Sequence, residues 1–554
     1  GGKARGLAFI DLLLKQNKFH HKYPGVFVTI PKTVVISTEI FDEFMDSNNL
    51  YDIALSNTDD EEILKHFIKS SLPLSLLQDL EKYLSIVEKP IAIRSSSLLE
   101  DSHYQPFAGI YSTFMLPLTD GKSKNLKKLS EAIKSVYASV YFKASKSYMS
   151  ATHNVIDEEK MAIVLQEVCG TTYNEGFYMP SFAGVTRSVN FYPIGDEIAS
   201  DGIVEIALGL GKHIVDGGGN NLRFSPKNSA KTLQLSTPSL ALSSTQKHFF
   251  ALDLKQEEFK PSINDGINII RMSIRQLPSD PSMRMMLSTY DFHSKMIRDS
   301  IDEQGKKIIT FSHILKYNKF PLNQIITDIL KIGQEAMGNP IEIEFAVNLN
   351  KSANNEFTFN LLQIRPIVES SDSKIVNIND DIDENAIIYS DSSLGNGIYR
   401  GVRDIVYIKP ETFNAANNLK IPPLLDNLNE KYKKENKNYI LIGPGRWGSS
   451  DYWLGIPIIW PNISQSKIII ESGLSNYRID PSQGTHFFQN LTSFNVGYLT
   501  VNPYIKQGVL DYEYLNKQPA HYEDEFIRVV RFKKDLSIKL DGRNGKAVVY
   551  KPEK

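Results

Sequence analysis

Hydrophobic and polar positions recur along the chain with two periods, and these divide it into helical and extended segments. Apolar residues spaced three to four apart predict an amphipathic helix over Leu7 to Lys15 and further helices within Thr38 to Leu84 and Leu126 to Ala151. Short β-prone runs predict two strands within Pro24 to Ser37, and a fully apolar run predicts a buried strand over Glu159 to Cys169. We therefore expect an α/β (α+β) fold.

The stretch from Ile91 to Phe114 combines strands, a cation and a glycine. It opens with a β-prone run that places Arg94 at a strand end, and three serines follow. The paired acids Glu100 and Asp101 come next, then Gly109 and a second strand-like run. A guanidinium beside hydroxyl groups and a glycine turn form a cradle suited to phosphate oxygens. The same pattern also fits a surface β-hairpin with a solvated acid pair.

A second hairpin is expected between Pro340 and Pro366. Glu342 and Glu344 alternate with apolar residues, so a strand places both carboxylates on one face. About twenty residues later, Gln363 and Arg365 share one face of another strand. Antiparallel pairing would bring these groups together, with oxygens suited to Mg²⁺ and a guanidinium suited to a transferred phosphoryl group. A solvated face of an amphipathic hairpin is the alternative.

Length and composition bound the possibilities. The chain has 554 residues, which is too long for one core. Its 62 Lys and Arg nearly balance its 64 Asp and Glu, so we expect neither a nucleic-acid nor a membrane partner. We find no apolar run long enough to cross a bilayer and no leader, and the single Cys169 is typical of a reducing cytoplasm. Because the chain opens with Gly1 inside an apparent motif, we expect that it is part of a longer protein or that it begins just after a processing site.

IRSSSLLED…FAGIYSTF resembles the signature of the PEP/pyruvate-binding family of the pyruvate phosphate dikinase and phosphoenolpyruvate synthase type. Further segments match that family in order: GGK, MAIVLQ, EIEFA and LLQIRP, whereas a GxxxxGK[ST] loop is absent. The resemblance implies an ATP-grasp module with lobes over 1–155 and 156–370. It also implies a linker over 371–385 and a smaller, β-rich, swivelling phosphohistidine-like domain over 386–554.

The resemblance also assigns roles to single residues. It implies ATP and Mg²⁺ as cofactors, Glu344 and Gln363 as metal ligands, and Arg94 and Arg365 as catalytic phosphate contacts. Glu342 replaces a family aspartate. The end of the strand at Gln166 corresponds to the hinge that reads adenine, although a plain buried strand has the same pattern. The implied nucleotide-binding residues are Lys3, Arg94, Gly109, Thr113, Gln166, Glu167, Val168, Glu344, Gln363 and Arg365.

Two segments depart from the family pattern. FAGVTRSVNF, residues 182–191, lacks the usual hairpin motif and keeps only Gly184 as its expected turn. In GLGK, Lys212 stands where the family has glutamate. This charge reversal either removes a contact or adds a phosphate ligand, and both interpretations stay open.

The segment YILIGPGRWG contains the GxGxxG spacing of a dinucleotide-binding turn. That motif requires a helix before the next strand, which ends near Glu471. Gly455, Pro457 and Pro461 interrupt this region, so we expect no dinucleotide site.

Gly484-Thr485-His486 occupies the place of the phosphorylated histidine in the resemblance. Neutral imidazole is a competent nucleophile near neutral pH, which makes His486 the candidate catalytic acceptor. Phe487 and Phe488 replace small alanines of the family, and a structural histidine is the equal alternative.

Together these patterns favour an ATP-dependent phosphotransferase of the dikinase type. It would transfer a phosphoryl group from Mg-ATP to a histidine and then to a small-molecule acceptor such as pyruvate. The acceptor site would lie in another domain or chain. The alternatives are a non-catalytic ATP-binding sensor and a phosphotransferase acting on an acceptor other than pyruvate.

Overall fold

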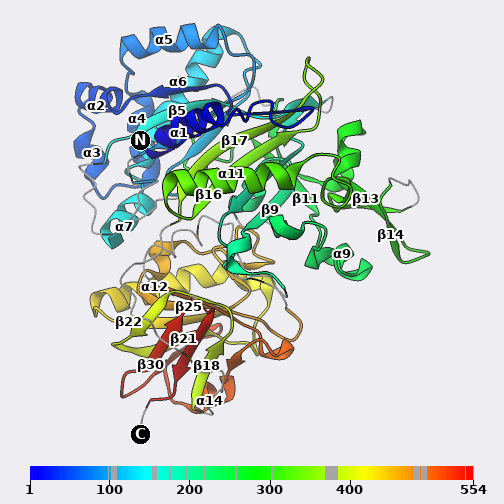
Figure 1. Ribbon diagram of the computed structural model, residues 1–554. Helices are drawn as coiled ribbons and strands as arrows, with labels where there is room; N and C mark the ends of the chain where they lie inside the picture. Colours follow the sequence, from blue (N-terminus) through cyan, green and yellow to red (C-terminus); the bar gives the residue numbers. More distant parts are fainter. Residues whose placement is uncertain are drawn as a thin grey trace. The chain divides into compact units, whose positions relative to one another are not determined.

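The chain folds into two compact units (Figure 1). The first consists of Gly1–Asn190, Ser200–Ile214 and Gly219–Ile367, and the second of Phe191–Ala199, Val215–Gly218 and Val368–Lys554. The computed structural model describes residues 1–97, 99–100, 109–152, 159–173, 176–191, 193, 196–216, 220–255, 259–300, 305–367, 378, 385–477, 487, 496–542 and 544–552.

The first seven helices of the first unit fall in or next to the expected helical segments, whereas α8 to α11 were not predicted. Their bounds are α1 Gly2–Gln16, α2 Thr38–Ser47, α3 Tyr51–Leu55, α4 Asp60–Lys69, α5 Leu74–Leu84, α6 Lys122–Ser139, α7 Lys143–Thr152, α8 Lys212–Val215, α9 Pro238–Ser244, α10 Ser312–Leu315 and α11 Leu322–Met337. The first helix begins earlier than expected, at Gly2 instead of Leu7, so Lys3 lies in its first turn.

Strands of the first unit form four sheets. The six-stranded sheet has the order β1 Val26–Thr29, β17 Phe357–Pro366, β16 Ile341–Asn348, β8 Phe182–Arg187, β9 Ile203–Leu208, β10 Leu222–Phe224. One four-stranded sheet has the order β2 Thr33–Ile36, β5 Ala162–Glu167, β3 Ile91–Ser96, β4 Thr113–Leu116. The others are β12 Ile269–Ser273, β11 His248–Asp253, β7 Phe177–Met179, β6 Thr171–Tyr173, and β14 Met296–Arg298, β13 Leu287–Asp291, β15 Lys306–Ile309.

The six-stranded sheet lies beneath two helices. Figure 1 shows α1 and α11 beside β16 and β17, and α1 packs on β17 while α11 packs on β16. Buried apolar residues of these elements form one core, to which Leu14, Ile326 and Phe345 contribute. Apolar burial of this kind is the main stabilising contribution to the unit.

Strand pairing in the first unit does not follow the order of the sequence. The two short strands expected within Pro24 to Ser37 are present, but β1 joins β17 and β2 joins β5. The strand β5, which begins after residue 155, pairs with β2 and β3, which precede it. The division into lobes at residue 155 therefore stays a prediction.

The strand β3 is longer than the sequence suggests. Arg94 does not end it but lies inside it, opposite Val164 of β5 and Thr113 of β4. The reason is that the buried Ser95 and Ser96 continue the ladder with β5.

Described residues of the second unit form two larger sheets and a strand pair, together with the helices α12 and α14. The seven-stranded sheet has the order β19 Ser393–Leu394, β26 Gly497–Val501, β25 Ser466–Ser472, β22 Asn438–Pro444, β21 Val402–Ile408, β29 Ile527–Arg531, β28 Ala520–Glu523. The five-stranded sheet has the order β20 Asn396–Tyr399, β30 Ser537–Asp541, β31 Lys546–Tyr550, β18 Ala386–Ser390, β27 Val509–Leu510. The remaining elements are β23 Arg446–Trp447, β24 Gly455–Ile456, α12 Ile421–Lys434 and α14 Tyr512–Lys517.

Four neighbouring strands of the seven-stranded sheet, β21, β22, β25 and β26, are parallel. The helix α12 connects β21 to β22, as parallel pairing requires a long crossover. The fold of the chain is thus mixed α/β, as expected. Among the described residues, no helix combines the length and apolar character needed to span a membrane.

Candidate nucleotide-binding site

The β16–β17 hairpin forms as the alternating pattern predicts. The two strands are antiparallel, and Glu342 lies opposite Arg365 while Glu344 lies opposite Gln363. Side chains two residues apart on a strand share a face, so all four groups lie on the same side of the sheet. The hairpin therefore presents carboxylate, amide and guanidinium groups together.

Arg94 connects this hairpin to the sheet formed by β2, β5, β3 and β4. Its Nη1 donates to Gln166 Oε1 at 3.1 Å and to the backbone carbonyl of Leu362 at 3.0 Å. Its Nη2 donates to Gln363 Oε1 at 2.9 Å and to Glu344 Oε2 at 3.4 Å. Hydrogen bonds from a charged donor are stronger than neutral ones. Three of the expected site residues thus surround the guanidinium of a fourth, Arg94.

Lys3, in the first turn of α1, reaches β3 at Ser95, which is the residue after Arg94. Its Nζ donates to the Ser95 carbonyl at 3.0 Å and to Ser95 Oγ at 3.2 Å, and it forms an ion pair with Glu100. Glu100 is only 2% exposed and accepts hydrogen bonds from Ser95 Oγ at 2.7 Å and from the Ser97 amide at 3.0 Å. The expectation of a solvated acid pair is therefore wrong for Glu100, whereas Asp101 lies outside the described residues. A buried carboxylate needs these partners to remain charged.

The end of β5 carries the three expected hinge residues. Gln166 is bonded to Arg94, and the Glu167 carboxylate lies 3.8 Å from Lys32 Nζ and 3.9 Å from Lys89 Nζ. Val168 donates its amide to the Pro90 carbonyl at 2.8 Å and accepts from Tyr178 Oη at 2.8 Å. The backbone of Val168 is thus engaged within the protein, and its role in reading adenine stays a prediction.

An apolar cluster surrounds the end of this strand. Its buried members are Ala92, Val168, Tyr178, Leu210 and Leu252, and the half-buried Met115, Phe250, Leu254 and Ile269 pack against them. An apolar surface next to a few convergent polar groups is typical of a small-molecule site.

Gly109 and Thr113 flank the start of β4. Gly109 has a φ of 67°, which L-residues with a side chain rarely adopt, and this explains a glycine at this turn. Thr113 lies opposite Arg94, and its backbone amide donates to Asp265 Oδ2 at 3.0 Å. Asp265 is a neighbour that the sequence did not indicate.

Glu342 holds two arginines inside the six-stranded sheet. Its Oε1 accepts from Arg365 Nε at 2.8 Å, and its Oε2 accepts from Arg187 Nε at 2.6 Å. Burial alone would raise the pKa of Glu342, but the two guanidinium groups outweigh it and lower the pKa to about 2. Arg365 Nη2 also lies 3.9 Å from Glu344 Oε1, so this triad adjoins the Arg94 cluster.

Sequence reasoning missed Arg187. It lies in β8 directly opposite Glu342. The available signal was one arginine at the end of an otherwise apolar strand, FAGVTR. Its partner became visible only with the register of β8 and β16.

Comparison with protein-family models gives one match, to the family described as "Pyruvate phosphate dikinase, AMP/ATP-binding domain". It covers residues 1–386, well over half of the 554 residues. The chain belongs to this family. Comparison with curated protein sequences found no matching relative.

Membership of the pyruvate phosphate dikinase AMP/ATP-binding family identifies the first unit as an ATP-grasp-like nucleotide-binding module. The match spans all the expected nucleotide-binding residues from Lys3 to Arg365. This match ends at residue 386, and the remainder of the second unit is described by its structure.

Glu344 and Gln363 are suitable ligands for Mg²⁺. Both side-chain oxygens lie within hydrogen-bond distance of the same cationic atom, Arg94 Nη2, so they already converge on one positive charge. Mg²⁺ is commonly held by one or two protein oxygens and completes its shell with water and phosphate. Among the described residues no group of three or more His, Cys, Asp or Glu is placed to hold a metal ion.

His486 lies outside the described residues. Its neighbour Phe487 is described, and its ring packs against Gly448 at the end of GPGRWG. Residues 445–465 contain β23, β24 and a 3-10 helix but no α-helix, so the helix required for dinucleotide binding is absent there, as predicted.

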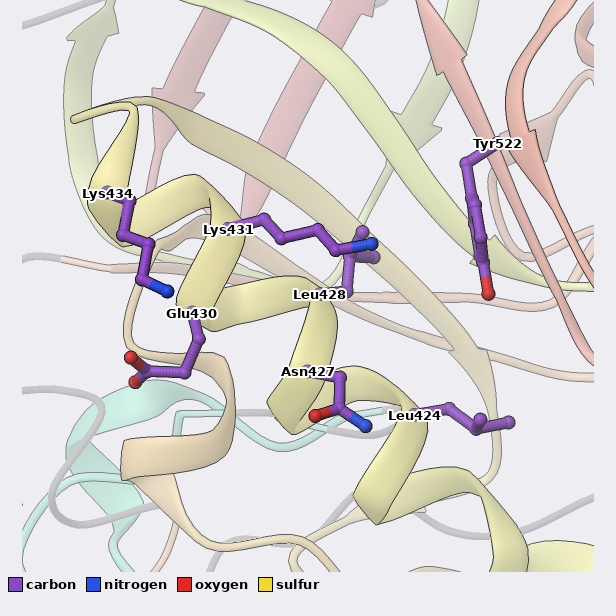
Figure 2. A pocket seen from close by; sticks show the side chains of 7 residues that line it. All are labelled: Leu424, Asn427, Leu428, Glu430, Lys431, Lys434 and Tyr522. Carbon is purple, nitrogen blue, oxygen red and sulfur yellow. The ribbon is translucent and has the colours of Figure 1, made fainter.

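A pocket of about 460 Å³ lies between α12 and β28 in the second unit. Figure 2 shows Lys431 extending from α12 toward Tyr522, with Leu424 and Leu428 on the same helix. Lys431 Nζ lies 5.6 Å from the centre of the Tyr522 ring. No candidate nucleotide-binding residue lines this pocket.

Proposed function

We propose that the chain is an ATP-dependent phosphotransferase of the dikinase type. The observation that carries this proposal is the cluster around Arg94, in which Gln166, Glu344 and Gln363 approach one guanidinium. Family membership supports ATP as the ligand of the module.

In this proposal the apolar cluster at Val168 binds the base, and Arg94 and Lys3 bind phosphate oxygens. Both cations are bonded to protein oxygens in the structure, so phosphate would replace some of these partners. Mg²⁺ held by Glu344 and Gln363 would neutralise the charge of the phosphates. Glu342 orients Arg365 beside Glu344. Catalysis would consist mainly of positioning and charge neutralisation.

We propose His486 as the first phosphoryl acceptor. An imidazole nitrogen would attack the β-phosphorus of ATP as the bond from that phosphorus to the oxygen bridging the α-phosphate breaks, so that AMP leaves with the electron pair and the β- and γ-phosphates stay on the histidine. Attack of water on the γ-phosphorus would then release orthophosphate and leave one phosphoryl group on the imidazole. The phosphoryl group would then pass to a small molecule such as pyruvate, at a site in another domain or chain.

Incubation with Mg-ATP labelled at the β-phosphate tests this proposal. We expect an acid-labile label on the wild-type chain and on His521→Ala, whose exposed histidine lies in β28 of the same unit, and none on His486→Ala. AMP release should accompany labelling. ATP binding without label or AMP release, unchanged by His486→Ala, would instead indicate a non-catalytic sensor.

The acceptor can be identified separately. Adding pyruvate to the labelled chain should discharge the label if pyruvate is the acceptor. Retention of the label with pyruvate, but loss with another small molecule, would indicate a phosphotransferase of different specificity.

A further inference from the structure

Lys212 follows the turn Gly209-Leu210-Gly211 and begins α8. Leu210 belongs to the buried apolar cluster with Val168 and Ala92, so this turn runs beside the surface proposed for the base. The family pattern has glutamate at this position, and the lysine reverses the charge that a bound nucleotide would meet.

The Lys212 ammonium group lies near the start of β4. Its Nζ is 3.9 Å from Asp265 Oδ1, and Asp265 Oδ2 accepts from the Thr113 amide at 3.0 Å. Thr113 in turn lies opposite Arg94 on β3. Lys212 is therefore connected through one carboxylate and one strand residue to the position of Arg94.

The segment around Asp265 follows the outer edge of β4. Asp265 binds the Thr113 amide, and Asn268 Nδ2 donates to the Met115 carbonyl at 2.7 Å. These bonds hold the segment in place without help from Lys212. Asp265 is thus bonded to β4 through Oδ2, and its Oδ1 lies nearest to Lys212.

The contact between Lys212 and Asp265 is weak. The two side chains are 28% and 34% exposed, and ion pairs at this exposure contribute little because water screens them. A lysine ammonium is a compact point charge on a flexible stem, which suits it to phosphate. A phosphate group next to Arg94 would compete with the partly exposed Asp265 carboxylate for this ammonium group.

We propose that Lys212 is an additional phosphate ligand of the nucleotide site, and that Asp265 holds its ammonium group there until nucleotide binds. This inference rests on the proposed function. In this inference, Lys212 stands in place of the expected glutamate because it binds the phosphate chain. The inference predicts that the chain favours ATP over AMP through Lys212, because the contact grows with the number of phosphate charges.

Calorimetric titration with ATP and AMP tests the inference. Lys212→Met should weaken ATP binding about tenfold and AMP binding by less than about twofold, as expected for loss of one charged hydrogen bond. Lys212→Glu should weaken ATP binding further. The control Lys227→Met, which removes a cation 3.2 Å from Asp201 in the same unit, should bind both nucleotides like the wild type.

Asp265→Asn provides a second, opposite variant. It retains an oxygen for the Thr113 amide but removes the charge that competes with phosphate, so it should strengthen ATP binding about twofold to fivefold. The inference is overturned if Lys212→Met binds ATP like the wild type, if it weakens ATP and AMP equally, or if Asp265→Asn weakens ATP binding as Lys212→Met does. Absence of ATP binding by the wild-type chain would overturn the proposed function as well, so the two failures are distinguishable.

Discussion

Arg94 and Gln363 lie on different sheets of the first unit and are joined by a hydrogen bond of 2.9 Å from Nη2 to Oε1. The same guanidinium reaches Gln166 on its own sheet and Glu344 on the other. A single side chain thus links the strand end proposed for the base to the hairpin proposed for the metal.

Arg94→Gln should lose most ATP affinity. It removes a charge that would bind phosphate, together with the hydrogen bonds that Arg94 Nη2 donates to Glu344 and Gln363. We expect ATP binding to weaken by about tenfold to one hundredfold, since hydrogen bonds to charged groups contribute about 1.5 to 3 kcal/mol. Titration with ATP measures this, and Arg298→Gln, which alters an exposed ion pair with Asp291, is the matched control. Equal affinities of the two variants would contradict the assignment.

If Glu344 and Gln363 both bind Mg²⁺, a carboxylate at either position should support Mg²⁺ binding. Glu344→Gln should raise the Mg²⁺ concentration needed for half-maximal ATP binding about tenfold, because one carboxylate ligand becomes a neutral amide. Combining it with Gln363→Glu restores one carboxylate on the facing strand, since these residues lie opposite each other. The double variant should therefore recover part of the lost Mg²⁺ affinity. A double variant as weak as Glu344→Gln alone would show that Gln363 does not face the ion.

The alternation of charged and apolar residues was sufficient to predict the hairpin of β16 and β17. A strand has a period of two, so the position of one buried residue determines which side chains share its face. The register that places Glu344 opposite Gln363 agrees with this simple rule. The roles of these groups toward a metal remain predictions.

Contacts between elements far apart in the sequence could not be predicted in this way. The Lys3–Glu100 ion pair joins α1 to the residues after β3, and no local pattern indicates it. Gly184 was expected in a turn but lies inside β8, where a Cβ would come within 2.2 Å of the Phe345 ring. The glycine is required there by close packing, which only the pairing of β8 with β16 reveals.

Glu342→Gln should destabilise the chain strongly. It leaves Arg187 and Arg365 buried beside a neutral amide, and removing one partner of a buried ion pair typically costs about 3 to 5 kcal/mol. Urea unfolding at pH 7 measures the loss. Glu342→Asp, which restores the family residue, should lose less because the charge remains.

The pH dependence of Glu342→Gln supplies a second readout. The pKa of Glu342 is lowered from 4.5 to about 2 in the folded chain, where burial opposes the shift and the two arginines outweigh it. Its stabilising contribution is therefore present above pH 4.5 and is lost as pH falls toward 2. The difference in unfolding free energy between wild type and variant should shrink over this range. A difference that stays constant with pH would show that the charge of Glu342 does not cause the stabilisation.

Glu159 should lower the stability of the folded chain as pH rises, whereas Glu342 raises it. The pKa of Glu159 is raised from 4.5 to about 7, because burial and the nearby Glu100 charge together outweigh the opposing effects of a hydrogen bond with Ser97 and of the N-terminal ammonium group. Between these two pH values the folded chain keeps a proton that the unfolded chain releases, so stability falls as pH rises.

Glu159→Gln removes this dependence because its amide is neutral throughout. At pH 8 the variant should be more stable than the wild type by up to about 3 kcal/mol, and near pH 4 the two should be similar. Thermal unfolding at several pH values measures the difference, and Glu81→Gln, which alters an exposed glutamate of α5, should follow the wild type. If Glu159→Gln and the wild type show the same dependence on pH, the carboxyl group of Glu159 does not hold a proton in the folded chain.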